Sequence, residues 1–368
     1  MLQLMILLAV SMGLAYCSQN NILVYSFTKK HNFDLPLIAM VLILSFFVGL
    51  RTHFNDTSLY IELFKGAPTF REFLNSEHEL ADNPLFYAFQ SLFRHHISDN
   101  PHIYLISIAL FTNASIICFI KKFSDNFPFS MLLFFALGQY VSTMAAMKQC
   151  IAIAILTYGI KALLKKKYLI FYIFVLIAML FHAYAIFFVI LPIFINKPWT
   201  ITTYITVFGV AFVLLTFEST ITSFLNVASD AGKEIDSKYV FDEVGINLFR
   251  LAVFSVPAIL SFIFQGLLDK GYNAHKNVMM NMSILSFLIM LMGIFGGANL
   301  FGRSAIYFEL GTIVIMPWIV KELFDEESQN FAHILVGGCY LAFFAYSVID
   351  FSSGYKMIGL GEFIKGIF

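Results

Sequence analysis

The chain has 368 residues, of which 59% are hydrophobic and only 12% are charged, and its formal net charge is zero. Soluble globular domains are roughly 45–50% apolar and about 25% charged, so the composition excludes an ordinary soluble domain. The balance of charges argues against nucleic acid as a partner. Because apolar runs recur along the whole chain, we predict an all-α polytopic membrane protein that is embedded in the lipid bilayer.

Apolar segments long enough to cross a bilayer follow one another along the sequence. A span needs about 20 mostly apolar residues, with about 17–25 the usual range. The segment 168–195 is too long for one span and has His182 near its middle, so we expect either two short arms or a tilted helix with a re-entrant piece. We predict about ten to twelve transmembrane helices in a single transmembrane domain, residues 1–368. The candidate spans cover residues 2–18, 35–50, 102–120, 127–147, 148–164, 168–195, 200–217, 247–267, 278–298, 303–320 and 332–349.

Two polar stretches, at about 51–101 and 218–246, are too long to be simple turns between spans. Within the first, residues 83–93 (NPLFYAFQSLF) place Leu85, Phe89, Leu92 and Phe93 at helical spacing. We expect these residues to form the apolar face of a helix that lies along the membrane interface.

The sequence predicts that lysines gather in the loops on one side of the membrane and arginines on the other. Short loops between spans hold twelve lysines and no arginine, and the positive-inside rule places such loops in the cytoplasm. Every intervening turn is then outside if residues 168–195 cross twice. All the arginines fall on the outer side under this topology. They are Arg51, Arg71, Arg94, Arg250 and Arg303.

The stretch 144–184 predicts a helical hairpin whose two ends meet on the outer side. A lysine cluster, Lys161 and residues 165–167, separates its two apolar segments. Lys148 opens the first segment and His182 lies near the end of the second. With the cluster in the cytoplasm, the ammonium and the imidazole lie at the same outer face.

Arg51 ends the second span and precedes Asp56 and Tyr60, which share a face if they lie on a helix. One interpretation is an arginine that extends to the interface, with its stem against apolar surface. The other is a guanidinium that holds a phosphate, for which its planar fork suits bidentate binding.

Lys148 and Gln149 open a span without an acidic neighbour within one turn. The lysine either extends to the interface or binds an anionic ligand, since a cation beside apolar spans is costly elsewhere. His182 is surrounded by apolar residues. It is either a hydrogen-bonded residue between helices or a general base, for which an imidazole is suited.

The late segment NLFGRSAIYFEL contains Arg303, with Tyr307 one turn further on. Arg250, at the start of the span 247–267, is another outer cation that we expect to contact substrate. No hydrolase elbow, P-loop or zinc motif is present in the sequence. The outer carboxylates lack convincing ligand spacing, so we expect neither a metal nor a cofactor.

Several short motifs in order resemble the EpsG-type, Wzy-like polysaccharide polymerases. GLRTHFNDTSLYIELF is similar to the family's Gly-Leu-Arg segment, and NPLFYAFQSLF to the short helix that ends its first outer loop. MKQCIAIAI, FHAYAIFFVILP and GRSAIYFEL resemble its Arg-Gln, Phe-His and late Arg-x-x-x-Tyr segments. Two departures stand out. Lys148 occupies the usual arginine position, and residues 52–55 lack the glycine often found before the acid at Asp56.

The resemblance implies a glycosyltransferase that joins oligosaccharide units carried on undecaprenyl diphosphate, at the outer face of the bacterial cytoplasmic membrane. Typical products are O-antigen, capsule and exopolysaccharide, and a chain-length regulator and a flippase of the same pathway are the expected protein partners. The span count and the two long outer loops predict a GT-C-like arrangement. A lipid-linked oligosaccharide flippase or exporter and a membrane O-acetyltransferase are the alternatives.

We assign roles to the candidate residues from their places at span ends. Arg51, Lys148 and Arg303 are expected to hold the donor diphosphate, because cations stabilise the charge that the leaving group gains. His182 is expected to take the proton from the acceptor hydroxyl, with Asp56 as the substitute base. The remaining candidates for contacts with diphosphate or glycan are Gln149, Tyr60, Tyr307 and Arg250.

Overall fold

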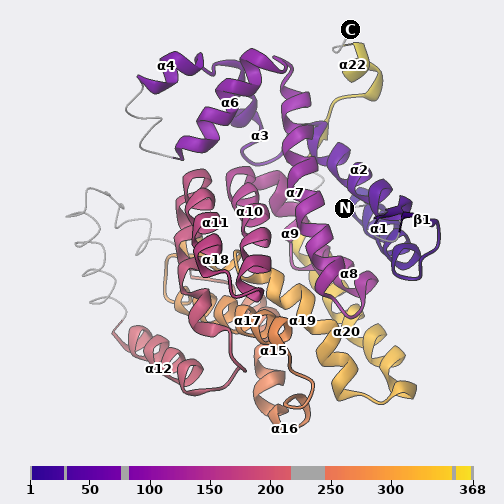
Figure 1. Cartoon of the computed structure of the whole chain (residues 1–368), viewed down its shortest axis with the longest axis vertical. Coiled ribbons are helices and arrows are strands. Elements are labelled where there is room, and N and C mark those ends of the chain that lie inside the picture. The colour runs from indigo at the N-terminus through magenta and orange to yellow at the C-terminus, as the bar shows by residue number, and fades with distance from the viewer. Residues whose placement is uncertain (1, 29–30, 76–82, 217–244, 350–353, 366–368) are drawn as a thin grey trace. The chain divides into compact units, whose positions relative to one another are not determined.

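The computed structural model describes residues 2–28, 31–75, 83–216, 245–349 and 354–365 (Figure 1). Its regular elements, in chain order, are α1 Leu2–Gln19, β1 Val24–Thr28, β2 His31–Asp34, α2 Leu35–Gly49, β3 Arg51–His53, α3 Thr57–Lys65, α4 Phe70–Leu74, α6 Pro84–His96, α7 Pro101–Phe123, α8 Phe127–Ala136, α9 Gln139–Ala145, α10 Met147–Leu164, α11 Tyr168–Phe181, the 3-10 helix η1 Ala183–Phe194, α12 Ile201–Leu215, α15 Leu248–Ile263, α16 Gln265–Leu268, α17 Ala274–Met292, α18 Ala298–Ala305, α19 Glu309–Leu323, α20 Glu326–Ser347, β4 Lys356–Met357 and α22 Leu360–Lys365. Most of the second predicted outer loop, 218–246, and the lysine pair Lys29 and Lys30, predicted to be cytoplasmic, lie outside the described residues.

The predicted all-α polytopic class is confirmed, but fewer helices than expected have the length of a full span. Among the described residues, the four long apolar helices are α1, α7, α10 and α20. Counting the bent pairs α8 with α9 and α18 with α19 as one span each raises the number to six. Four of the predicted spans contain shorter apolar helices of 10–17 residues, and one of these spans, 168–195, contains two. The expectation of ten to twelve came from apolar runs that are longer than the regular helices within them.

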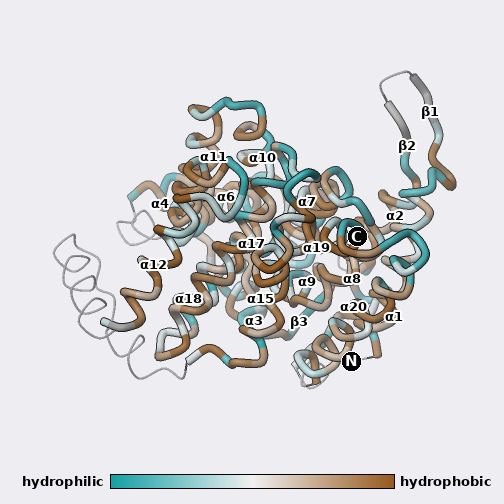
Figure 2. The backbone as a smooth tube through the Cα atoms, turned by 90° about the horizontal axis from the view of Figure 1, so that it is seen from below, coloured by the Kyte–Doolittle hydropathy of each residue, from teal (hydrophilic) through white to brown (hydrophobic). Residues whose placement is uncertain are grey.

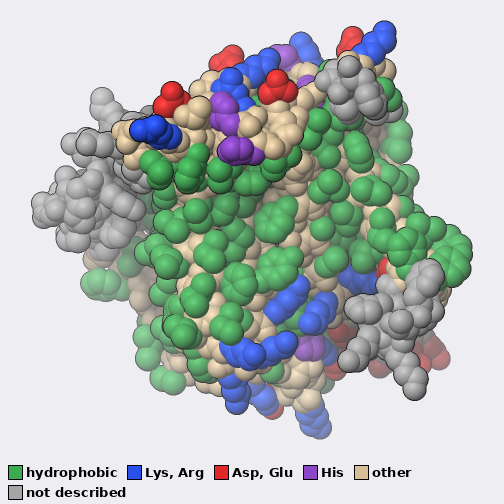
Figure 3. Space-filling view, turned by 45° about the horizontal axis from the view of Figure 1, so that its top comes forward, with side chains coloured by type: hydrophobic (Ala, Val, Ile, Leu, Met, Phe, Trp, Pro, Cys, Tyr) green, Lys and Arg blue, Asp and Glu red, His purple; other side chains and the backbone are tan. Residues whose placement is uncertain are grey.

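Hydropathy follows this architecture. Figure 2 shows the helices coloured mainly as hydrophobic, with hydrophilic residues gathered in connections such as the turn between α10 and α11. On the face shown in Figure 3, hydrophobic side chains fill a broad band, and charged and histidine side chains lie at its margins. Such a band is what a bilayer requires of the surface that it covers.

The chain forms two compact units, Met1–Ile186 with His333–Phe368, and Phe187–Ala332. In the first unit, α7 packs against α2 and α10, and α1 packs against α2 and α8. The close approach of α2 and α7 depends on Gly49, because a Cβ there would lie 2.2 Å from Ile106 Cγ1. In the second unit, α17 packs against α15, α18 and α19. Gly311 allows the α17–α19 contact, since its Cβ would lie 2.5 Å from the Met279 carbonyl oxygen.

Helix starts in the first unit follow local sequence signals. Asn100 caps α7 by accepting from the His102 backbone N–H at 2.9 Å, and Pro101 fills the first helical position. Asn126 caps α8 in the same way, through the Phe129 N–H at 3.1 Å. A helix is present where the sequence predicted one at 83–93, as α6.

The face of α6 that is buried within the protein only partly overlaps the apolar face predicted for the membrane interface. Phe86, Gln90 and Phe93 are buried, whereas Leu92 is 40% exposed. The reason is that α6 packs against α3, α4 and α11, so its contacts are set by three neighbours. A single apolar stripe therefore does not describe its inner face.

Candidate active site

The α10–α11 hairpin has the predicted arrangement. The two helices pack along each other and are joined by a tight turn at residues 165–167. Gly159 permits the close packing, because a Cβ there would lie 3.2 Å from Phe174 Cβ. Lys148 and His182 are each about 20–25 Å along a helix from this turn, at 1.5 Å per residue. The hairpin therefore carries both side chains at the end opposite the lysine cluster.

Lys148 contacts aromatic side chains of α6. Its Nζ donates to the Tyr87 hydroxyl at 2.9 Å, and it lies 4.3 Å from the centroid of the Tyr87 ring and 4.9 Å from that of Phe86. No carboxylate of the described residues forms an ion pair with it. A cation held by ring faces and a hydroxyl keeps its full charge available for an anion.

Tyr60 and Asp56 lie beside this contact, at the start of α3. Asp56 is the exposed N-cap residue, and Tyr60, one turn on, is buried against Phe86 with ring centroids 6.0 Å apart. Burial, with a smaller effect of the Asp56 carboxylate, raises the pKa of Tyr60 to about 12. The backbone of Lys148 forms a hydrogen bond with Tyr60, so α3 is joined to the start of α10.

Arg51 fits neither interpretation drawn from the sequence. The guanidinium is fully buried, 0% exposed. Its Nε donates to Thr57 Oγ1 at 2.9 Å and its Nη1 to the Val48 carbonyl oxygen, while Nη2 has no acceptor among the described residues. Burial lowers the pKa of Arg51 to about 10, so the group stays protonated at neutral pH. In this structure the cation braces β3 against α3 and is not open to a ligand.

The C-terminal segment closes over this buried cation. β4 pairs antiparallel with β3, and Arg51 lies opposite Met357. The Tyr355 hydroxyl donates to the Phe47 carbonyl oxygen at 2.7 Å, and its ring stacks on Phe47. The last part of the chain therefore completes the surroundings of Arg51.

His182 ends α11 and begins the break that the sequence suggested. Its backbone is extended (φ −158°, ψ 116°), and η1 starts at the next residue, so the apolar run is broken into two short helices. The ring is partly buried and lies edge-on to Tyr184, with centroids 5.3 Å apart. The neighbouring candidate Gln149, on α10, is buried.

The second unit holds the remaining candidates. Arg303 is exposed in the last turn of α18, and Tyr307 is buried in the bend before α19. Arg250 Nη2 lies 3.7 Å from Oε1 of Glu309, a carboxylate that is 0% exposed. Neither oxygen of Glu309 accepts a hydrogen bond from a described residue. Arg250 is thus an ion-pair partner, and its contact with substrate stays a prediction.

Sequence reasoning overlooked two of the residues that define these sites, Phe86 and Tyr87. Tyr87 and Phe86 lie within the NPLFYAFQSLF motif, and two adjacent aromatic residues in an amphipathic helix were the available signal. Glu309 is a carboxylate in an apolar run, which is itself a mark of function in membrane proteins.

The fold and the site together define a polytopic membrane protein with a cation and an imidazole at one end of a helical hairpin. The sequence model of the EpsG family matches residues 34–359. The chain therefore belongs to the EpsG family, a family of Wzy-like polysaccharide polymerases. Comparisons with curated proteins and with solved structures find no match.

Proposed function

We propose that this protein is a glycan polymerase that joins undecaprenyl-diphosphate-linked oligosaccharide repeat units at the outer face of the bacterial cytoplasmic membrane. The family supports a polysaccharide polymerase role in general. The observation that carries the finer proposal is the hairpin, with Lys148 and His182 at the end opposite the lysine turn. The positive-inside rule favours the lysine turn in the cytoplasm and these two residues outside.

The reaction that we propose is a transfer between two lipid-linked glycans. The hydroxyl at the non-reducing end of one unit attacks the anomeric carbon of the growing chain on a second carrier, forming a C–O bond. The anomeric bond to the diphosphate breaks, and undecaprenyl diphosphate leaves with the electron pair. His182 accepts the hydroxyl proton, with Asp56 as the alternative base.

Lys148 is the cation best suited to the leaving diphosphate. It has no carboxylate partner among the described residues, and a fixed cation stabilises charge that develops in the transition state. Arg51 stabilises the structure around the site and does not bind the ligand itself, because its buried guanidinium joins β3 to α3. Arg303, exposed on α18 of the second unit, stays a predicted diphosphate-binding residue.

The surface glycan of a deletion strain tests the proposal. We expect single capped repeat units without the gene and long polymer when it is restored. Loss of all surface glycan would indicate the flippase alternative, because units would then fail to reach the outer face.

Substitution of His182 tests the proposed base. His182→Ala and His182→Gln are both expected to reach the membrane at normal levels and to give single units, because glutamine cannot accept the proton. Polymer length on a gel and protein level by immunoblot are the measurements. Normal polymer from His182→Ala would move the base to Asp56.

A further inference from the structure

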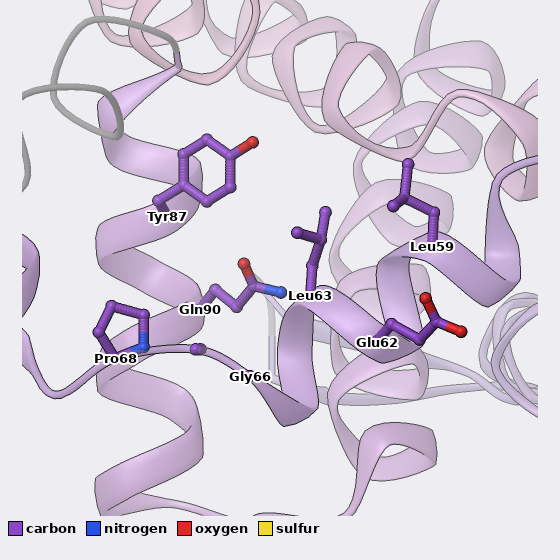
Figure 4. A pocket seen from close by; sticks show the side chains of 8 residues that line it. Leu59, Glu62, Leu63, Gly66, Pro68, Tyr87 and Gln90 are labelled. Atoms are coloured by element: carbon purple, nitrogen blue, oxygen red, sulfur yellow. The ribbon is translucent and has the colours of Figure 1, made fainter.

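A cavity of about 270 Å³ lies between α3 and α6 in the first unit (Figure 4). Leu59, Glu62 and Leu63 line it from α3, Tyr87 and Gln90 line it from α6, and the chain at Gly66–Pro68 runs between the two helices. The volume lies just below the range of about 300–1,000 Å³ that is typical of pockets for drug-sized ligands. It therefore suits one or two small rings better than a long chain.

The walls of the cavity are held firmly. Arg94 Nη1 donates to the Ala67 carbonyl oxygen at 2.6 Å and fixes the connecting segment to α6. Phe64 of α3 stacks on Tyr104 of α7, with ring centroids 4.4 Å apart, and meets Phe93 of α6 at 6.2 Å. A site built on packed helices keeps its shape before the ligand arrives, which reduces the cost of binding.

Gln90 supplies the observation that points to a ligand. The residue is 1% exposed, and Nε2 has no hydrogen-bond partner among the described residues. Figure 4 shows its side chain extending from α6 toward Leu63, with the amide beside the cavity. A buried donor without an acceptor is costly, so a ligand that offers an oxygen to this amide would remove the penalty.

The lining selects the chemistry of that ligand. The Glu62 carboxylate accepts hydrogen bonds, the Gln90 amide donates them and the Tyr87 hydroxyl does both. The leucines, Ala67 and Pro68 give an apolar wall. A sugar ring has hydroxyls that donate and accept, and C–H faces that suit an apolar wall. A diphosphate would be repelled by Glu62, and an isoprenoid chain would leave the buried Gln90 amide without a partner.

Tyr87 connects the cavity to the cation. Its ring lines the cavity, while its hydroxyl accepts the hydrogen bond from Lys148 Nζ. We propose that the cavity between α3 and α6 binds the sugar ring next to the diphosphate of a lipid-linked oligosaccharide, while Lys148 binds the diphosphate. This inference rests on the proposed function for the identity of the carrier, but the cavity and its lining do not depend on it.

Binding to the purified full-length protein tests the inference with three probes. These are the repeat-unit oligosaccharide released from the host's lipid carrier, undecaprenyl diphosphate without sugars, and the intact lipid-linked unit. The variants Glu62→Gln and Gln90→Leu keep the size of each side chain and remove the charge or the amide. The matched controls are Asp99→Asn and Gln139→Leu. Asp99 is an exposed carboxylate that follows α6 in the chain, and Gln139 is another buried glutamine with no partner among the described residues.

We expect each cavity variant to weaken binding of the free oligosaccharide and of the intact unit about tenfold, the loss of roughly one hydrogen bond to a buried or charged group. Binding of sugar-free undecaprenyl diphosphate should not change in these variants, and the two controls should bind like the wild type. Lys148→Ala should show the reverse pattern, with weaker binding of both lipids and unchanged binding of the free oligosaccharide.

Two results would overturn the inference. One is wild-type affinity of Glu62→Gln and Gln90→Leu for the oligosaccharide and for the intact unit. The other is an equal affinity of the wild type for the lipids with and without sugar, because the cavity would then take no sugar. Failure of the proposed function is seen separately, as unchanged glycan length in the deletion strain.

Discussion

Lys148 in the first unit and Arg250 in the second are both cations near the start of apolar helices, but their partners differ in charge. Lys148 meets two aromatic rings and a hydroxyl, whereas Arg250 faces the buried carboxylate of Glu309. A carboxylate neutralises the cation that it pairs with, while ring faces leave its charge in place. The comparison assigns anion binding to Lys148 and a mainly supporting role to Arg250.

The largest effect is expected from removing the unneutralised cation. Lys148→Ala should lower the polymerisation rate about 100-fold or more, the usual cost of losing one group that stabilises developing charge. Lys148→Arg should be tolerated, since it keeps the charge and restores the residue usual in the family. Polymer ladders from the complemented deletion strain are the measurement.

Lys65→Ala is the matched control, because Lys65 is an exposed lysine in the last turn of α3, the helix that carries Tyr60. Normal polymer from Lys148→Ala would contradict the contrast drawn between Lys148 and Arg250, because neither cation would then be needed to bind the anion. A silent Lys148→Ala together with a silent Arg303→Ala would remove the diphosphate-binding role altogether.

A smaller effect, on stability, is expected at the paired cation. Arg250→Ala leaves Glu309 buried without its partner and should lower the free energy of unfolding by about 1–3 kcal/mol, less than the full cost of breaking a buried pair because the arginine is partly exposed. Adding Glu309→Gln should recover much of this loss, since a neutral amide needs no cation. Thermal unfolding in detergent measures both changes.

Polymer length in the double variant sharpens the comparison further. If Arg250 only supports the fold, a stable double variant should make long polymer. A stable but inactive double variant would show that Arg250 also contacts substrate, as the sequence predicted.

The smallest effect is expected at Asp34. Its ion pair with Lys121 is a structural one, with which the pairs at the site can be compared. Asp34 caps α2, accepts from Ser18 Oγ at 2.7 Å and is bonded by Lys121. Burial alone would raise the pKa of Asp34, but the hydrogen bonds from Lys121, Ser18 and Leu37 outweigh it and lower the pKa below its ordinary value. Asp34→Asn keeps a capping oxygen and should cost about 1 kcal/mol at neutral pH.

The sign of the pH dependence follows from the lowered pKa. A carboxylate with a lowered pKa in the folded state adds stability above its unfolded pKa of about 3.9, and that stability is lost as the pH falls through the folded value. The wild type should therefore lose more stability than Asp34→Asn between about pH 5 and pH 3. Equal losses in unfolding experiments would show that this pair contributes nothing.

Much of the site was predictable because it depends on local pattern. Helical spacing and a lysine turn were enough to place Lys148 and His182 at one end of a hairpin, and the break at His182 followed from an apolar run too long for one span. The helix 83–93 was predicted from its periodicity. These features are properties of neighbours in sequence, which a single sequence displays.

The rest depends on contacts between distant segments. The burial of Arg51 needs the C-terminal Tyr355 and β4, and the buried face of α6 is set by α3, α4 and α11. The bend between α8 and α9 occurs at Gly138, with φ +83°, inside a run that reads as one span. The aromatic partners of Lys148 come from a different helix, and no local pattern pairs an α10 lysine with an α6 tyrosine.

The pairing of β3 with β4 has a consequence for biosynthesis. Tyr355 and the Phe47 carbonyl that it binds are 308 residues apart, so a ribosome makes the first segment long before the strand that completes it. Before β4 has been synthesised, the N–H and C=O groups of β3 that pair with it lack these partners. The Arg51 guanidinium is then also without Tyr355, which lies near it in the folded protein. The surroundings of Arg51 are therefore completed only after the last helices of the chain have been made.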